Sequence, residues 1–211
     1  MTELSDPPAT VSARLRAATA VAHEQAENSM FVDDLLSGRL DTAAYGRLAG
    51  QLYFVYQALE SVGDALAGDP IADAVGDEKL RRVPRLRADL AALGVDVARL
   101  RPLPATADYV AAIEATRTHP ARYVAHHYTR YLGDLSGGQV VAHRMRRHYG
   151  LDDSALTFYT FDVDGLKRYK DAYRERLDVL PLDAAGVEEL TAEAVSAFRH
   201  NQALFAELAA G

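Results

Sequence analysis

The sequence contains no cysteine among its 211 residues. Disulfide bridges, thiolate-bound zinc and cysteine-bound iron–sulfur clusters are therefore excluded, and a metal ion would need histidine, carboxylate or tyrosine ligands. No apolar run is long enough to cross a bilayer, and the start, MTELSDPPAT, lacks the basic and apolar segments of a secretory signal. These absences predict a cytoplasmic protein without a membrane anchor.

Net positive charge is also lacking, because the formal net charge is −7. This balance argues against general nucleic-acid binding. Two basic runs depart from it, KLRRVPRLR at residues 79–87 and HRMRRH at residues 143–148. They fit either solvated helix faces or a docking surface for an acidic partner.

Strand signals are scarce, whereas helical periodicity is strong. Asp41 is predicted to cap a helix whose apolar residues recur at spacings of four and three, namely Leu48, Leu52, Val55, Leu59 and Val62. Further helices are predicted over residues 10–28, 77–93, 105–117, 120–149, 163–179 and 184–209. We see no repeat or linker. The expected architecture is one all-α domain over residues 10–211, after a disordered or extended tail at residues 1–9.

The stretch GDLSGGQV at residues 133–140 contains the letters LSGGQ, which mark ABC-type ATPases. Such an enzyme also needs a P-loop, in which a lysine follows G-x-x-x-x-G. Asp69 and Gln139 stand at the two positions where that lysine would be required. The nucleotide interpretation therefore fails, and the glycines need another explanation.

Three glycines lie inside the strongest predicted helix, although each interior glycine costs about 1 kcal/mol relative to alanine. Either one helix ends at Gly137–Gly138, or a kinked helix brings its backbone close to a ligand. Gly133 and Gly137 are four residues apart and share one helix face. A face without side chains admits a flat molecule. Arg130 and Asp134, also four apart, place a carboxylate beside that groove.

A second pattern lies near the N-terminus, where His23 and Glu27 are at positions i and i+4 of a helix. A metal-binding histidine usually donates its other ring N–H to a carboxylate or carbonyl, and Glu27 is within reach. The alternative to a metal-binding role is that His23 is an ordinary surface histidine. A zincin site is excluded, because the sequence contains no H-E-x-x-H motif. The other histidines form no ligand set and are interpreted as structural or solvent-facing: His119, His126, His127, His143, His148 and His200.

Taken together, the two patterns resemble haem oxygenase. The resemblance rests on HEQAENSMF (23–31) and YTRYLGDLSGGQVV (128–141), and it extends from Leu15 to about Leu208 through QLYFVYQALE (51–60), YKDAYRERL (169–177) and FRHNQALFAEL (198–208). It implies an all-α fold in which haem b lies between a proximal N-terminal helix and a kinked, glycine-containing distal helix. LSGGQ is then a coincidence of five letters.

The resemblance also implies an activity. Haem is both cofactor and substrate, and O₂ with electrons from an external donor opens the ring at the α-meso carbon, giving biliverdin, ferrous iron and CO. The implied donor is an acidic ferredoxin, flavodoxin or reductase, with Arg147 and Arg176 near the exposed haem edge. We expect a monomer. Some relatives carry a C-terminal membrane anchor; this sequence ends at Gly211 without one and is expected to resemble the soluble bacterial form.

Residue roles follow from the same resemblance. His23 matches the proximal iron ligand, and Glu27 matches its hydrogen-bond partner. The matches on the distal side are Gly133 and Gly137 over the haem face, Asp134 with Arg130 and Tyr56 around a distal water, and Phe198 and Asn201. The matches for the haem propionates are Arg16, Tyr128, Lys170 and Arg174. Arg16 stands where many relatives carry lysine, so the charge is kept but the geometry changes.

Two other functions compete with the enzyme. A haem carrier or sensor would need His23 and the pocket but no organised distal water, and a helical bundle could lack haem altogether. Asp134 together with Arg130 and Tyr56 favours the enzyme.

Overall fold

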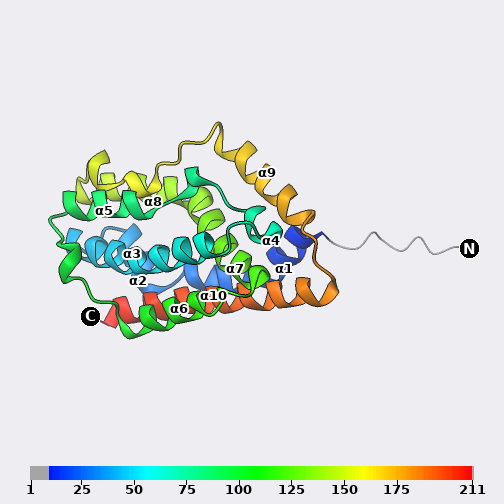
Figure 1. Cartoon of the computed structure of the whole chain (residues 1–211). Coiled ribbons are helices and arrows are strands. Elements are labelled where there is room, and N and C mark those ends of the chain that lie inside the picture. The colour runs from blue at the N-terminus through cyan, green and yellow to red at the C-terminus, as the bar shows by residue number, and fades with distance from the viewer. Residues whose placement is uncertain (1–9, 211) are drawn as a thin grey trace, which may run out of the picture.

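The computed structural model describes residues 10–210, apart from the side chain of Glu27. The described part is helical, and no strand occurs in it. Its α-helices are α1 (Val11–Glu27), α2 (Met30–Leu36), α3 (Thr42–Ala65), α4 (Pro70–Asp73), α5 (Val83–Ala92), α6 (Pro104–Glu114), α7 (Pro120–His127), α8 (Gly133–Tyr149), α9 (Leu166–Asp178) and α10 (Ala184–Ala210) (Figure 1). The tail predicted at residues 1–9 lies outside the described residues.

Helix α3 forms the centre of the core. It begins as predicted, since the Asp41 carboxylate accepts a hydrogen bond from the Ala44 N–H at 2.7 Å. Every residue of its predicted apolar stripe is buried. Helices α5, α6 and α7 pack against it, and the long α10 runs beside α1, α6 and α7 (Figure 1). None of the described helices has both the length and the apolar character of a membrane span.

The predicted helix over residues 120–149 contains one irregular turn. Helix α7 continues into a π-helical turn, η3 (Tyr128–Leu132), and then into α8, which ends at Gly150 with φ 64°. The α-helix runs through Gly137 and Gly138, so the alternative in which a helix ends there is wrong. Single π-helical turns inside helices are frequent at functional sites.

The helix predicted over residues 77–93 is broken in two. A 3₁₀ turn, η1 (Glu78–Leu80), precedes α5, which starts next to Pro84. Proline lacks an N–H, and its ring would clash with the carbonyl of Leu80 in a continuous helix. That carbonyl instead accepts a hydrogen bond from Arg82 Nε at 2.7 Å. Helices α2 and α4 were not predicted. Three further 3₁₀ turns are η2 (Val97–Arg99), η4 (Asp153–Ala155) and η5 (Thr157–Tyr159).

Candidate active site

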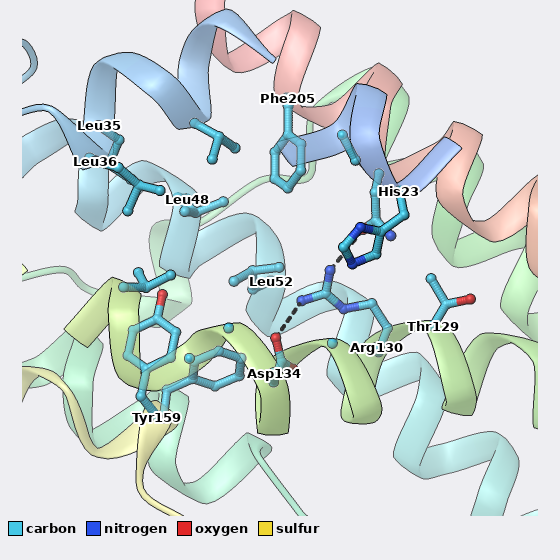
Figure 2. A pocket seen from close by; sticks show the side chains of 18 of the residues that line it. His23, Leu35, Leu36, Leu48, Leu52, Thr129, Arg130, Asp134, Tyr159 and Phe205 are labelled. Carbon is cyan, nitrogen blue, oxygen red and sulfur yellow. Dashed lines mark hydrogen bonds and ion pairs between the residues drawn. The ribbon is translucent and has the colours of Figure 1, made fainter. Parts of the chain in front are cut away.

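Two adjoining cavities lie between α1 and α8. Their volumes are about 200 Å³ and about 490 Å³. Both are lined by His23, Thr129, Gly133 and Phe198, so they form one continuous cleft. The two volumes together fall in the usual range for a site that encloses a small organic molecule. Figure 2 shows His23 on one side of the cleft, with Arg130 and Asp134 facing it from the opposite side.

The three glycines of the 133–138 stretch serve two purposes. A Cβ atom added at Gly133 or Gly137 would meet no heavy atom within 4 Å, and both residues line the cleft, as the shared helix face predicts. A Cβ atom at Gly138 would lie 3.0 Å from Tyr159 Cδ1. Gly133 and Gly137 therefore leave the floor of the cleft open, whereas Gly138 admits the Tyr159 ring.

His23 reaches the cleft from α1. Its ring packs edge-on against the ring of Phe198, with the centroids 5.6 Å apart. Phe198 also packs against Ala22 and Ala26 of α1. The structure thus places Phe198 beside His23, whereas the sequence resemblance had placed it on the distal side. The side chain of Glu27 lies outside the described part of the chain, so its pairing with His23 stays a prediction.

Four polar side chains meet at the start of α8. The Tyr56 hydroxyl donates a hydrogen bond to Asp134 Oδ2, and Arg130 Nη2 lies 3.3 Å from Asp134 Oδ1. Arg130 also donates to the Tyr56 hydroxyl at 3.3 Å and to Asn201 Oδ1 at 2.8 Å. Arg130, Tyr56 and Asn201 are buried. The structure therefore joins Asp134, Arg130, Tyr56 and Asn201, all predicted as site residues, in one network.

Burial dominates the electrostatics of this network. It raises the pKa of Asp134 well above its ordinary value, while the hydrogen bonds from Tyr56 and Arg130 favour the charged carboxylate. Burial also lowers the pKa of the Arg130 guanidinium. A carboxyl group with a raised pKa at the edge of a cleft is suited to holding and releasing a proton.

One end of the cleft is polar and cationic. Arg16 and Arg174 line it together with Tyr128 and Ser136. Lys170 Nζ lies 3.4 Å from Ser136 Oγ, which brings a third cation to the same end. The predicted propionate-binding residues are thus gathered in one place, as two carboxylates of a ligand would require.

The opposite end is apolar, and sequence reasoning missed most of it. Its walls include Val32, Leu35 and Leu36 of α2, Leu48 and Leu52 of α3, and Phe158 and Tyr159 of η5. Figure 2 labels Leu35, Leu36, Leu48, Leu52 and Tyr159 among them. Neither α2 nor η5 was predicted. An imidazole opposite a bare helix backbone, apolar walls and cations at one end form a set that fits haem.

Comparison with known proteins supports this assignment. The family model described as heme oxygenase matches residues 9–207. Heme oxygenase 1 of Synechocystis sp. is 36% identical over 94% of this chain and 84% of its own length, and the heme oxygenase of Pyropia yezoensis is 38% identical over 94% and 86%.

The fold agrees with the sequence match. The crystal structure of the Synechocystis heme oxygenase-1 in complex with heme superposes with a TM-score of 0.90 at 36% identity, covering 95% of this chain and 92% of that one. A heme oxygenase from Leptospira interrogans also gives a TM-score of 0.90, at 31% identity over 94% and 100% of the two chains. The expected all-α fold is confirmed. The chain therefore belongs to the haem oxygenase family and is a haem-degrading enzyme.

Proposed function

We propose that this chain opens the haem ring at the α-meso carbon and forms biliverdin, ferrous iron and CO from O₂ and electrons of an external donor. The observation that carries the proposal is the cleft itself. His23 lies across it from the side-chain-free Gly133 and Gly137, and the buried Asp134 network stands beside that floor. A haem carrier would need His23 and the cleft but not the Asp134 network.

Substrate binding would use both ends of the cleft. His23 is proposed to ligate the iron through a ring nitrogen, and bound haem would supply the iron centre at which O₂ is activated. Arg16, Arg174 and Lys170 would pair with the propionates, with Tyr128 beside them. The apolar side chains of α2 and α3 would cover the opposite edge of the macrocycle.

The Asp134 network would control protons. Tyr56 and Arg130 hold the carboxylate from two directions, and Asn201 holds Arg130 in turn. We assign to Asp134 the role of orienting a water molecule in the cleft and passing protons through it. The chain has no cysteine, so no thiolate can assist the reaction from the other side of the ring. Proton delivery is therefore the main way in which the protein would promote the reaction.

The glycines would direct the reaction in space. With no side chain at Gly133 or Gly137, the backbone of α8 can approach the face of the ring and leave little height above it. This close approach would direct oxidation toward the ring edge.

Electrons are proposed to come from an acidic redox protein that docks on a monomer of this chain. Arg147 is exposed in the last turn of α8 and is available to such a partner. Arg176 is less available, because its Nε donates to the Ala74 carbonyl at 2.8 Å and its guanidinium lies over the Tyr169 and Tyr173 rings.

A reconstitution experiment tests the proposal. The protein is loaded with haem and supplied with ascorbate or a ferredoxin–reductase system in air, and its visible spectrum is followed. We expect the Soret band to disappear while the absorption of biliverdin grows. A spectrum that stays constant with every reductant would show a haem carrier instead, and a titration without stoichiometric haem binding would exclude both functions.

A further inference from the structure

Two buried charged residues, one at the N-cap of α5 and one within that helix, face the segment that lines the inner wall of the cleft. Arg82 stands at the start of the helix with 1% of its surface exposed, and Asp89 lies within it with 0% exposed. They are seven residues apart and so share one helix face. Neither residue lines the cleft, and the reaction proposed above uses neither. The contacts of Arg82 and Asp89 explain why these two charged side chains are buried.

Asp89 holds the start of the 3₁₀ turn η5. Its Oδ1 accepts hydrogen bonds from the Thr157 N–H at 2.8 Å and from the Thr157 hydroxyl at 2.5 Å. Its Oδ2 accepts one from the Phe158 N–H at 2.9 Å. Burial raises the pKa of Asp89, whereas these three donors favour the charged form.

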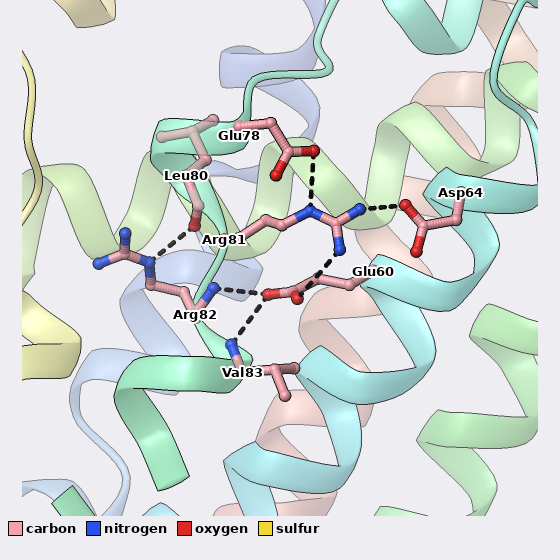
Figure 3. Close-up of polar contacts among 7 residues, drawn as sticks. All are labelled: Glu60, Asp64, Glu78, Leu80, Arg81, Arg82 and Val83. Carbon is pink, nitrogen blue, oxygen red and sulfur yellow. Dashed lines mark hydrogen bonds and ion pairs between the residues drawn. The ribbon is translucent and has the colours of Figure 1, made fainter. Parts of the chain in front are cut away.

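Arg82 holds the other end of the same turn. Its Nη1 donates to the carbonyls of Phe158, at 2.9 Å, and Thr160, at 2.8 Å. The backbone N–H of Arg82 itself donates to Glu60 Oε1, at 2.5 Å. Figure 3 shows this contact together with those of the neighbouring Arg81. Because Asp89 takes its N–H and Arg82 takes its carbonyl, the backbone of Phe158 is held on both sides by buried charges. Hydrogen bonds to charged groups are stronger than those between neutral groups.

The held segment touches the polar network directly. The Phe158 ring packs edge-on against the Tyr56 ring, with centroids 5.3 Å apart, and the Tyr56 hydroxyl is the group that donates to Asp134. Tyr159 meets α8, since its carbonyl accepts from Gln139 Nε2 at 2.8 Å and its ring packs at Gly138. A displacement of η5 would thus reach both Tyr56 and the floor of the cleft.

We propose that Asp89 and Arg82 are positioning residues, which hold Phe158 against Tyr56 and so keep the Tyr56 hydroxyl on Asp134. Neither touches the substrate. The inference rests on the proposed function, because it assigns the two residues to the proton-handling network of ring opening. It predicts that loosening η5 changes the outcome of the reaction and leaves the proposed ligation of the iron by His23 intact.

The test compares variants matched in chemistry. Asp89→Asn keeps the shape but removes the charge, and its N–H₂ group must replace an oxygen that accepts a hydrogen bond from the N–H of either Thr157 or Phe158. Thr157→Val removes the hydroxyl that donates to Asp89, and Thr157→Ser keeps it. Gln51→Met is the control: Gln51 is also buried and also holds a loop through backbone atoms, at Arg101 and Leu103, but it does not line the cleft.

Two quantities are measured for each variant. The first is the yield of biliverdin per haem consumed by the loaded protein in air with ascorbate. The second is amide hydrogen exchange in the haem-free protein, over residues 157–160 and over the first turn of α8. We expect Asp89→Asn and Thr157→Val to lower the yield, by about tenfold for Asp89→Asn, and to speed exchange in both segments. Thr157→Ser should behave as the wild type, and Gln51→Met should keep both the wild-type yield and the wild-type exchange in these two segments.

A double variant shows whether the effect passes through Tyr56. Combined with Tyr56→Phe, Asp89→Asn should lower the yield no further than Tyr56→Phe alone. The inference is overturned if Asp89→Asn and Thr157→Val keep the wild-type yield, if Gln51→Met lowers the yield equally, or if the two substitutions act independently. If Asp89→Asn fails to fold, the two Thr157 variants decide. If the wild-type chain forms no biliverdin, the proposed function fails, and the inference stands only if exchange at the start of α8 still depends on Asp89 or Thr157.

Discussion

At the residue scale, neighbouring glycines in one helix differ in what surrounds them. Gly137 faces open space in the cleft, and Gly138 faces the Tyr159 ring. Replacing Gly137 by alanine should raise the stability of the haem-free protein by about 1 kcal/mol, because an interior glycine is removed from a helix. The same change should weaken haem binding, since the new methyl group occupies the floor of the cleft.

Gly138→Ala is the matched comparison. Its methyl group would lie 3.0 Å from Tyr159 Cδ1, so the gain in helix propensity is offset by crowding. Thermal unfolding of the haem-free variants and haem titration measure both effects. Wild-type haem affinity in Gly137→Ala would show that the ligand does not approach this part of α8.

His23 gives a second prediction at this scale. In His23→Ala the proposed iron ligand is lost, while the cations at one end of the cleft and the apolar walls remain. Haem should still bind, more weakly, and turnover should stop until imidazole is added to fill the space left by the side chain. Full turnover without imidazole would mean that another group ligates the iron.

Spacing in the sequence predicted part of this site and could not predict the rest. Gly133 and Gly137 line one cleft, and Arg130 contacts Asp134, because four-residue spacings are local to a helix. Asn201 meets Arg130 from α10, and Phe158 meets Tyr56 from η5. Such contacts between distant segments depend on packing, which a single sequence without a resemblance does not reveal.

At the element scale, α1 carries both His23 and Arg16, and its start is tied to the end of α9. Asp178 accepts hydrogen bonds from the Ser12 N–H at 2.7 Å and from the Ser12 hydroxyl at 3.0 Å. These bonds satisfy a backbone donor that the first turn of a helix leaves free. They also fix α1 relative to the helix that carries Arg174 and Lys170.

Asp178→Ala should therefore cost about 1 kcal/mol of stability, as the loss of a helix cap does. It should also lower haem affinity, because the cations of α1 and α9 are no longer held together. Glu175→Ala removes an exposed carboxylate from the same turn of α9 and serves as the control. Urea unfolding measures the stability, and haem titration measures the affinity. Equal effects of the two substitutions would rule out a specific role for the hydrogen bonds between Asp178 and Ser12.

Most helices followed from periodicity, and the exceptions have local causes. The predicted span 77–93 failed because Pro84 forces a new helix start. Helix α2 has only seven residues, too few for a periodic pattern to stand out. The π-helical turn at Tyr128–Leu132 leaves no mark in the spacing, so the sequence could suggest an irregular distal helix but not the form of the irregularity.

At the scale of the whole molecule, the interior holds a neutral histidine that links stability to pH. The His127 ring lies among Tyr123, Tyr131 and Tyr173, and its Nδ1 is 2.8 Å from the Tyr173 hydroxyl. Burial, aided by the charge of Arg176, lowers the pKa of His127 to about 3. The unfolded chain takes up this proton below pH ~6.5, whereas the folded chain does not.

The free energy of unfolding should therefore fall as the pH drops below ~6.5, by about 1.4 kcal/mol per pH unit from this group. His127→Gln, which can still bond to Tyr173, should flatten that dependence. Burial acts to raise the pKa of Glu193, but hydrogen bonds from His126 and Arg122 outweigh this and lower the pKa to about 2. Protonation of Glu193 therefore adds a further loss of stability at lower pH. Other buried groups with shifted pKa values, such as Asp134 and His200, also contribute to the pH dependence of stability. The difference in slope between the wild type and His127→Gln, measured by urea unfolding between pH ~6.5 and ~4.5, therefore isolates His127, and an unchanged slope in the variant would refute its role.

The most direct test of the whole account is the reaction of the haem-loaded Asp134→Ala variant, compared with the wild type under O₂ and reductant and again with peroxide. Haem should bind normally, because Asp134 is assigned neither to the iron nor to a propionate. The biliverdin yield should fall steeply, by roughly 10²-fold or more, as expected when a positioned proton donor is lost, and peroxide should instead drive oxidation of added phenols. Asp134→Asn should be milder, since an amide can still orient a water molecule. A wild-type biliverdin yield from Asp134→Ala would contradict the account, and loss of haem from that variant would show that Asp134 serves the fold.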